Sequence, residues 1–220
     1  MKTWKQILDQ KKKFEMQKIE TLLKSAGLTD LLQLDPTIRK DVRYAGENNF
    51  TRKVLYKENF GLYAVKELAE AVVGANRFLQ SLFPGFGIVV FDAARPLSVQ
   101  KEMFDLVRNT ACEPYIADPY TENPGGFHNY GLAVDLSICD FEGKLLDMGT
   151  DYDSFQEVAH SGNEQRMVEE GKLSIEAYSN RMLLYFITGK FGLLPHPLEW
   201  WHFQLDYSEN YKKRHSLLEF

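Results

Sequence analysis

The chain has 220 residues, of which 44% are hydrophobic and 26% charged, which is typical of a soluble globular protein able to bury a core. Its net charge of −5 gives no reason to expect nucleic acid or an acidic membrane surface as a partner. The basic runs at 11–13 and 212–214 are expected to be solvated faces of a helix and a tail. No apolar run approaches the roughly 20 residues that span a bilayer, and the N-terminus lacks the apolar segment of a signal peptide. These features predict a single domain over 1–220 and a cytoplasmic location, or a periplasmic one if a leader has been removed.

Along the first half of the chain, apolar residues at helical spacing predict a helix over 4–26, within an N-terminal helical extension at about 1–35. An extended segment is expected at 41–45. A long core helix follows over 62–82, and the β-branched run 88–91 predicts a buried strand.

The second half begins with a predicted helix to about Arg108, for which Ser98 is the expected N-cap. Residues 112–126 are rich in Pro, Asp, Asn and Gly and predict a long loop, a kind of segment that is usually functional or disordered. Its acidic part, from Glu113 to Glu122, is a candidate lid. The remaining predictions are a strand over 132–138 in a hairpin with 144–148, a loop with one short helix over 151–172, a helix over 174–189 capped by Ser174, and a last strand at about 200–205.

Two separated clusters carry the chemistry, His128 with Asp135 and Glu199 with His202. Two imidazoles and one carboxylate with an open fourth position form the ligand set of a catalytic zinc ion, and a further carboxylate beside that position is the usual general base. On a straight strand the seven-residue spacing would place His128 and Asp135 on opposite faces, so joint ligation requires a bend near Gly131. Several divalent metals tolerate such a ligand set.

Each of these residues also has an ordinary structural interpretation. A lone histidine is more often a packed side chain than a ligand, and a lone aspartate in a strand is more often a salt-bridge partner. Glu199 and His202 could likewise form a buried pair beneath two tryptophans. Their joint occurrence in apolar surroundings, where unpaired charges are costly, favours the metal site. His160, His196 and His215 lack such company and are expected to be structural or exposed, with the first two as reserve ligands. Cys139 is expected to be a small buried thiol at a strand end.

Arg95 follows the strand at 88–91, where a fixed guanidinium can stabilise negative charge on a carbonyl oxygen. Without the metal cluster, a role in binding helix-end carbonyls would be the better interpretation. Asp153 lies in a predicted loop, where most aspartates serve as turn or capping residues.

Together these motifs resemble the VanX-type zinc D-alanyl-D-alanine dipeptidases, whose pattern is an arginine-proline pair after a strand, then S-x-H-x-x-G-x-A-x-D, then E-x-W-H. The similarity runs in order from about residue 35 to 205. The matching segments here are Asp92-Ala-Ala-Arg95-Pro96, His128-Asn-Tyr-Gly131-Leu-Ala-Val-Asp135 and Glu199-Trp-Trp-His202, with 41–45, 49–51 and 146–153.

The resemblance implies a Hedgehog-like α+β fold in which helices pack on a small antiparallel sheet and the zinc site lies on its concave side. It implies one zinc ion per chain, held by His128, Asp135 and His202. It further implies that Glu199 is the general base, that Arg95 stabilises the oxyanion and that Asp153 receives the ammonium group of a small dipeptide.

One departure concerns the substrate, because Gly126 replaces the serine of the family pattern and Phe127 adds a ring at the rim of the site. The expected substrate is therefore D-Ala-D-Ala or a related dipeptide. The alternatives are a D,D- or L,D-carboxypeptidase or endopeptidase acting on peptidoglycan stem peptides, and a non-catalytic zinc-binding module. The presence of Asp153 argues against the first alternative, and the presence of Glu199 and Arg95 argues against the second.

Overall fold

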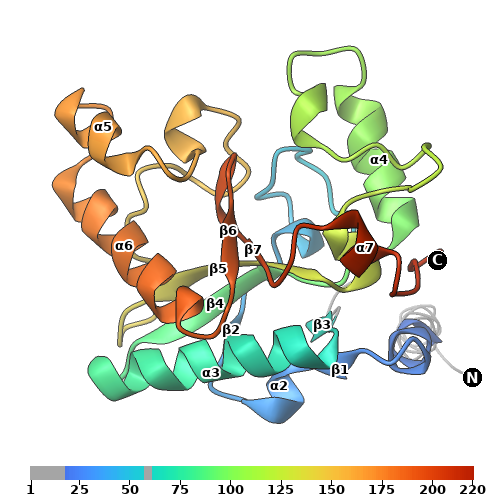
Figure 1. Ribbon diagram of the computed structural model, residues 1–220, viewed down its shortest axis with the longest axis horizontal. Helices are drawn as coiled ribbons and strands as arrows, with labels where there is room; N and C mark the ends of the chain where they lie inside the picture. The colour runs from blue at the N-terminus through green and yellow to red at the C-terminus, as the bar shows by residue number, and fades with distance from the viewer. Residues whose placement is uncertain (1–17, 57–60) are drawn as a thin grey trace, which may run out of the picture.

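The computed structural model describes residues 18–56 and 61–220 and has a five-stranded sheet at its centre (Figure 1). The strands lie in the order β2 (Arg39–Lys40), β4 (Gly87–Asp92), β5 (Ala133–Cys139), β7 (Glu199–Gln204) and β6 (Leu194–His196). All neighbouring strands are antiparallel except the edge pair β2–β4, which is parallel. The predicted α+β fold with a small, mainly antiparallel sheet is therefore confirmed.

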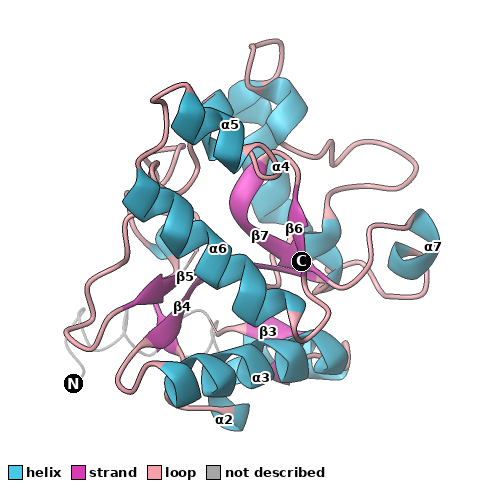
Figure 2. Cartoon of the chain, turned by 60° about the vertical axis from the view of Figure 1, so that its left-hand side comes forward, coloured by secondary structure: helices cyan, strands magenta, loops and turns pink. Residues whose placement is uncertain are grey.

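Helices pack around this sheet and around a two-stranded pairing of β1 (Thr29–Asp30) with β3 (Tyr63–Ala64). They are α2 (Leu31–Leu34), α3 (Lys66–Leu82), α4 (Leu97–Val107), α5 (Glu164–Glu169), α6 (Ile175–Gly189) and α7 (Glu209–Lys212). In both views α6 and α7 lie on opposite sides of the β6–β7 hairpin (Figures 1 and 2). No helix among the described residues is both long and apolar enough to cross a membrane.

The core forms where α3 packs against the sheet and α6. Leu68, Val72, Ala75 and Leu79 recur at three- and four-residue spacing along α3, and all are fully buried. A Leu-to-Ala change at such a position typically costs about 2–5 kcal/mol of stability. This packing supports the side of the sheet that is opposite the site.

Strand β5 is buried along its whole length, although its side chains alternate in character. Val134 and Leu136 point to one face, and Asp135 with Ser137 must point to the other, because successive side chains on a strand alternate. Figure 1 shows α3 below the sheet and the segment after β2, together with α4, above it. The polar positions of β5 therefore face a layer of loops, where the candidate site is found.

Most predicted helices are present with shifted ends. The helix expected from residue 62 begins at Lys66, because Tyr63 and Ala64 pair with β1. Ser98 is not the N-cap of α4: Pro96 occupies that position, and the Ser98 hydroxyl donates to the carbonyl of Phe220. The N-cap role of Ser174 on α6 is confirmed, since its hydroxyl accepts from the Ala177 N–H.

Other differences concern short extended segments and the N-terminus. Residues 43–45 form a 3-10 turn where an extended segment was expected, and the strand lies just before it, at Arg39–Lys40. The hairpin after β5 is reduced to a single bridge between Cys139 and Leu145. Residues 18–25 are helical, whereas residues 4–17 of that predicted helix lie outside the described part of the chain.

Candidate metal centre and active-site cavity

The bend expected near Gly131 is what brings His128 to Asp135. His128 lies in a 3-10 turn, Phe127–Tyr130, which Gly131 ends with φ of 69°. A side chain at Gly131 would be strained in this left-handed conformation, and its Cβ would lie 2.7 Å from a methyl carbon of Leu28. The turn lets His128 approach the face of β5 that carries Asp135.

Three side chains converge at this point with their ligand atoms within 4.8 Å of one another. Asp135 on β5 pairs across the sheet with His202 on β7, which places both on one face. The Asp135 Oδ1 atom lies 3.1 Å from His128 Nε2 and 3.2 Å from His202 Nδ1, and the two ring nitrogens are 3.1 Å apart. His128, Asp135 and His202 are all buried, so this group could hold a metal ion.

The outer nitrogens of both histidines are held by acceptors, which fixes the tautomer of each ring. His128 Nδ1 lies 2.7 Å from the Ala93 carbonyl oxygen, which can only accept, so Nδ1 carries the proton. The lone pair of His128 is therefore on Nε2, the atom that faces Asp135. Such outer-shell hydrogen bonds are usual for histidines that bind a metal.

His202 is fixed in the same way through Gln204. The Gln204 amide donates to the Asp206 carbonyl oxygen at 2.9 Å, which orients its own oxygen toward His202 Nε2 at 3.0 Å. Nε2 is thus the donor, and the lone pair lies on Nδ1. Two lone pairs and a carboxylate oxygen therefore face one point, an arrangement that a cation stabilises.

Asp135 has a different partner for each of its oxygens. The Tyr152 hydroxyl donates to Oδ2 at 2.8 Å and leaves Oδ1 facing the histidines. Burial would raise the pKa of Asp135, but His128 and His202 outweigh it and hold the pKa well below its usual range. Asp135 is accordingly ionised, as a metal ligand must be.

Arg95 is buried beside this group and is held from two sides. Asp92 Oδ2 accepts from its Nε at 2.8 Å and is 2.7 Å from its Nη2, while Gln100 accepts from its Nη1 at 2.9 Å. The Arg95 backbone N–H donates to the His128 carbonyl, so its position is tied to the turn that carries His128. Its Nη2 lies 3.8 Å from Asp135 Oδ2, which places a fixed positive charge next to the ligand group.

Glu199 and Asp153 supply two further carboxyl groups in this cavity. Glu199 Oε2 lies 3.6 Å from His202 Nδ1, and burial followed by the charges of Asp135 and Asp153 raises the pKa of Glu199 well above its usual range. Asp153 accepts from the Tyr44 hydroxyl at 3.0 Å and from the Phe50 N–H at 3.2 Å. Burial outweighs these hydrogen bonds and raises the pKa of Asp153 to about 7.

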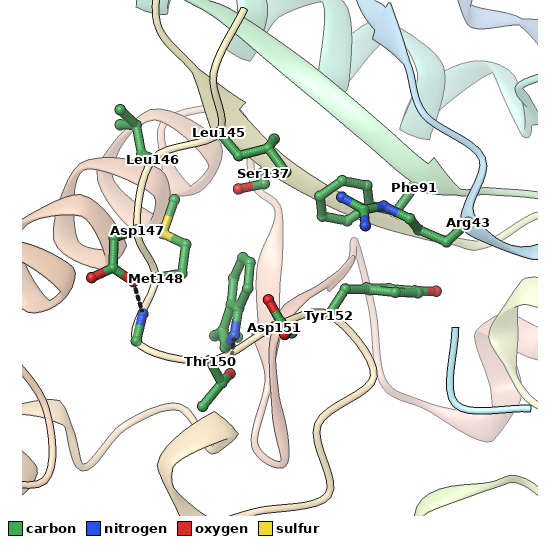
Figure 3. A pocket seen from close by; sticks show the side chains of 12 residues that line it. Arg43, Phe91, Ser137, Leu145, Leu146, Asp147, Met148, Thr150, Asp151 and Tyr152 are labelled. Atoms are coloured by element: carbon green, nitrogen blue, oxygen red, sulfur yellow. Dashed lines mark hydrogen bonds between the residues drawn. The ribbon is translucent and has the colours of Figure 1, made fainter. Parts of the chain in front are cut away.

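These groups line one cavity of about 340 Å³, and Phe127 lies in its wall with its ring 6.1 Å from that of Tyr207. A second cavity of about 500 Å³ is shown in Figure 3, between Arg43, Ser137 and the loop that carries Asp147 to Tyr152. The larger cavity contains none of the three ligands. The smaller one is therefore the candidate active site.

The remaining histidines take no part in the ligand group. The Nε2 atom of His160 lies 3.4 Å from the Tyr115 hydroxyl oxygen, and the His215 ring packs against Tyr211. His196 lines the cavity, but its Nδ1 accepts from the Leu198 N–H, and burial with the charge of His202 lowers its pKa to about 3. Cys139 is fully buried, which confirms its expected role as a core thiol.

Four residues that position this site are not predicted from the sequence: Tyr152 bonds to Asp135, Gln204 to His202, and Asp92 and Gln100 to Arg95. The spacing of Asp92 three residues before Arg95 is the only local signal for any of them. The solvated tail predicted at 212–214 is wrong at Lys212, whose side chain is buried in the wall of the cavity.

Comparison with known proteins agrees with this geometry. Residues 24–219 match the model of the Peptidase_M15 family, described as D-ala-D-ala dipeptidase. A D-alanyl-D-alanine dipeptidase of Escherichia coli K12 is 30% identical over 189 residues, which cover 84% of this chain and 87% of the relative. Another from Synechocystis sp. is 28% identical over 180 residues, which cover 64% of this chain and 69% of the relative.

The family match, together with a buried His/Asp group that could hold a metal ion, identifies the chain as a metallopeptidase of the dipeptidase type. It belongs to the Peptidase_M15 D-Ala-D-Ala dipeptidase family.

Proposed function

We propose that this protein is a zinc-dependent dipeptidase that hydrolyses D-Ala-D-Ala or a related dipeptide. The observation that carries the proposal is the convergence of two imidazole lone pairs and one carboxylate oxygen beside the Glu199 carboxyl group. Two nitrogens and one oxygen from protein, with a fourth position open, are the donor set of a catalytic zinc ion. When bound, zinc would polarise the scissile carbonyl and lower the pKa of water to about 7.

Glu199 is the proposed general base. Its Oε2 atom lies 3.6 Å from His202 Nδ1. At this position it can accept a proton from the attacking water and later donate it to the leaving amine. Burial, followed by the charges of Asp135 and Asp153, raises the pKa of Glu199, which makes its carboxylate a stronger base for this proton.

Arg95 is the proposed stabiliser of the negative charge that develops on the scissile carbonyl oxygen. Asp92 and Gln100 fix its guanidinium before substrate binds, so the charge needs no reorganisation during the reaction. Loss of such a preorganised donor typically costs about 100- to 1000-fold in turnover.

Asp153 is the proposed binding partner of the substrate ammonium group. Each of its oxygens accepts one hydrogen bond from the protein and has a further lone pair for an N–H donor. A buried carboxylate that lacks a cationic partner is costly, and a free amino terminus would provide that partner. This requirement favours a dipeptidase over a carboxypeptidase acting on longer stem peptides.

The test of this assignment is Glu199→Gln, with zinc content and turnover measured on the same preparation. The variant is expected to retain zinc and to lose activity by about 1000-fold, because the amide cannot carry the proton. Glu164→Gln is the matched control, since Glu164 is also buried but lines no part of this cavity, and it is expected to stay active. Loss of zinc from Glu199→Gln would instead make Glu199 a ligand.

A further inference from the structure

Two basic side chains line the active-site cavity, Arg95 and Lys212. The guanidinium of Arg95 is already paired with Asp92 and bonded to Gln100. Lys212 ends α7 and is only 5% exposed. It is therefore the cation in this cavity whose charge has no assigned role.

No carboxylate of the described residues contacts Lys212, and burial lowers the pKa of this lysine, although the charge of Glu209, three residues earlier in α7, partly offsets that effect. Its Nζ donates to the carbonyl oxygens of Gly125 at 2.8 Å and Asn123 at 3.3 Å, and it lies 5.1 Å from the centre of the Tyr130 ring. Within the described part of the chain, no carboxylate oxygen lies within 4.0 Å of this ammonium group. An ammonium group has three donors, so one remains for an acceptor. Burying a cation without an anion is costly, and an anionic ligand in the cavity would offset that cost.

Lys212 contacts the turn that carries His128 and the segment just before it. Gly125, whose carbonyl it binds, lies three residues before His128, and Tyr130 belongs to the same turn as His128. Asp153, by contrast, is held by Tyr44 and Phe50, on a separate segment of the cavity wall. The cavity thus has the carboxyl group of Asp153 and the ammonium group of Lys212 on different walls. This arrangement is complementary to a zwitterionic dipeptide, which has an ammonium group at one end and a carboxylate at the other.

We propose that Lys212 binds the carboxylate of the dipeptide substrate and so makes the enzyme selective for a free carboxyl terminus. This assignment rests on the proposed dipeptidase function. It also accounts for Gly126, because a buried ammonium group next to it supplies a donor where the family pattern has a serine hydroxyl. Recognition of the carboxylate through a charge-assisted hydrogen bond is stronger than through a neutral donor.

The experiment compares D-Ala-D-Ala with its C-terminal amide in the wild type, Lys212→Met and Lys212→Arg, all loaded with zinc. Lys212→Met is expected to lower kcat/KM for D-Ala-D-Ala roughly 10- to 100-fold, the range for losing a hydrogen bond to a charged group, mainly by raising KM. The amide is expected to be a poor substrate for the wild type, and Lys212→Met should leave its kcat/KM unchanged. Lys212→Arg should restore part of the selectivity for the acid. Lys213→Met removes the same charge from an exposed neighbour and should behave as the wild type.

A binding measurement separates recognition from turnover. In the Glu199→Gln background, calorimetry should show that Lys212→Met weakens binding of D-Ala-D-Ala and leaves binding of the amide unchanged. An equal loss for both ligands would show that Lys212 only holds the segment at Asn123–Gly125, and no loss would also overturn the proposal. If Lys212→Met does not fold, equal cleavage of acid and amide by the wild type overturns it as well. A wild type that cleaves no dipeptide would instead refute the proposed function itself.

Discussion

Each of the three candidate metal ligands is oriented by a second group, and Asp135 shows this most clearly. Its Oδ2 atom accepts from Tyr152, so Oδ1 is left to face the histidines. The Tyr152 ring itself packs against two aromatic rings, with a tilted contact to Phe91 at 5.1 Å and an edge contact to Trp201 at 5.3 Å between ring centres. Neighbouring aromatic side chains therefore set the orientation of a carboxylate that the sequence places on a strand.

Removal of this hydroxyl should weaken the metal site without unfolding the protein. We expect Tyr152→Phe to raise the zinc dissociation constant about 10-fold, within the range for losing an outer-shell hydrogen bond. Competition with a chromogenic chelator would measure it on purified protein. Tyr185→Phe is the control, because Tyr185 donates to Glu164 and lines no part of the metal cavity. Equal zinc affinity in Tyr152→Phe and the wild type would contradict the role given to Tyr152.

The raised pKa of Asp153 predicts how the metal-free protein responds to pH. Its folded-state pKa of about 7 exceeds the ordinary value of 3.8, so the folded state binds more protons across this window. Stability contributed by Asp153 is therefore present at low pH and lost as the pH rises toward 7. Between pH 5 and pH 8 the wild type should lose roughly 2 kcal/mol more unfolding free energy than Asp153→Asn. Chemical denaturation of both proteins across this pH range would measure the difference. If the unfolding free energies of the wild type and Asp153→Asn changed in parallel with pH, the pKa of Asp153 would not be raised in the folded state.

At the scale of elements, the site depends on the turn between residues 127 and 131 meeting the β5–β7 pair. The hydrophobic pattern predicts strands β5 and β7, and the odd spacing of His128 and Asp135 predicts a bend at Gly131. The pairing of Asp135 with His202 could not be predicted in this way, because strand register between segments 67 residues apart is set by tertiary packing.

Gly131→Ala tests this turn. The left-handed backbone should cost roughly 1–2 kcal/mol, and the contact with Leu28 should displace the turn and weaken zinc binding further. Gly171→Ala is the matched control, since Gly171 has φ of 70° but no atom within 4 Å of an added Cβ. Thermal unfolding and zinc titration of both variants would separate the two effects. An unchanged zinc affinity in Gly131→Ala would show that the turn does not set the position of His128.

At the scale of the whole molecule, the sequence predicts the α+β class, the main helices and all three candidate ligands. Those residues have unusual chemistry in apolar segments, so their pattern is visible without a structure. The groups that orient them, such as Tyr152 and Gln204, have no such signal, because an isolated tyrosine or glutamine is compatible with many environments. Lys212 likewise has no sequence signal for its position. Its basic neighbours predict exposure, and only the fold shows that its side chain is buried in the wall of the cavity.

Release of D-alanine from D-Ala-D-Ala by purified, zinc-loaded protein is the decisive measurement of the proposed dipeptidase activity. L-Ala-L-Ala and N-acetyl-D-Ala-D-Ala should be measured beside it, with chelator-treated protein as the metal-free control. We expect release from free D-Ala-D-Ala, loss of activity with the chelator, and little cleavage of the acetylated peptide, which has no ammonium group for Asp153. Efficient cleavage of the acetylated peptide would overturn the role of Asp153, and no cleavage of any peptide by protein shown to hold zinc would overturn the proposed function.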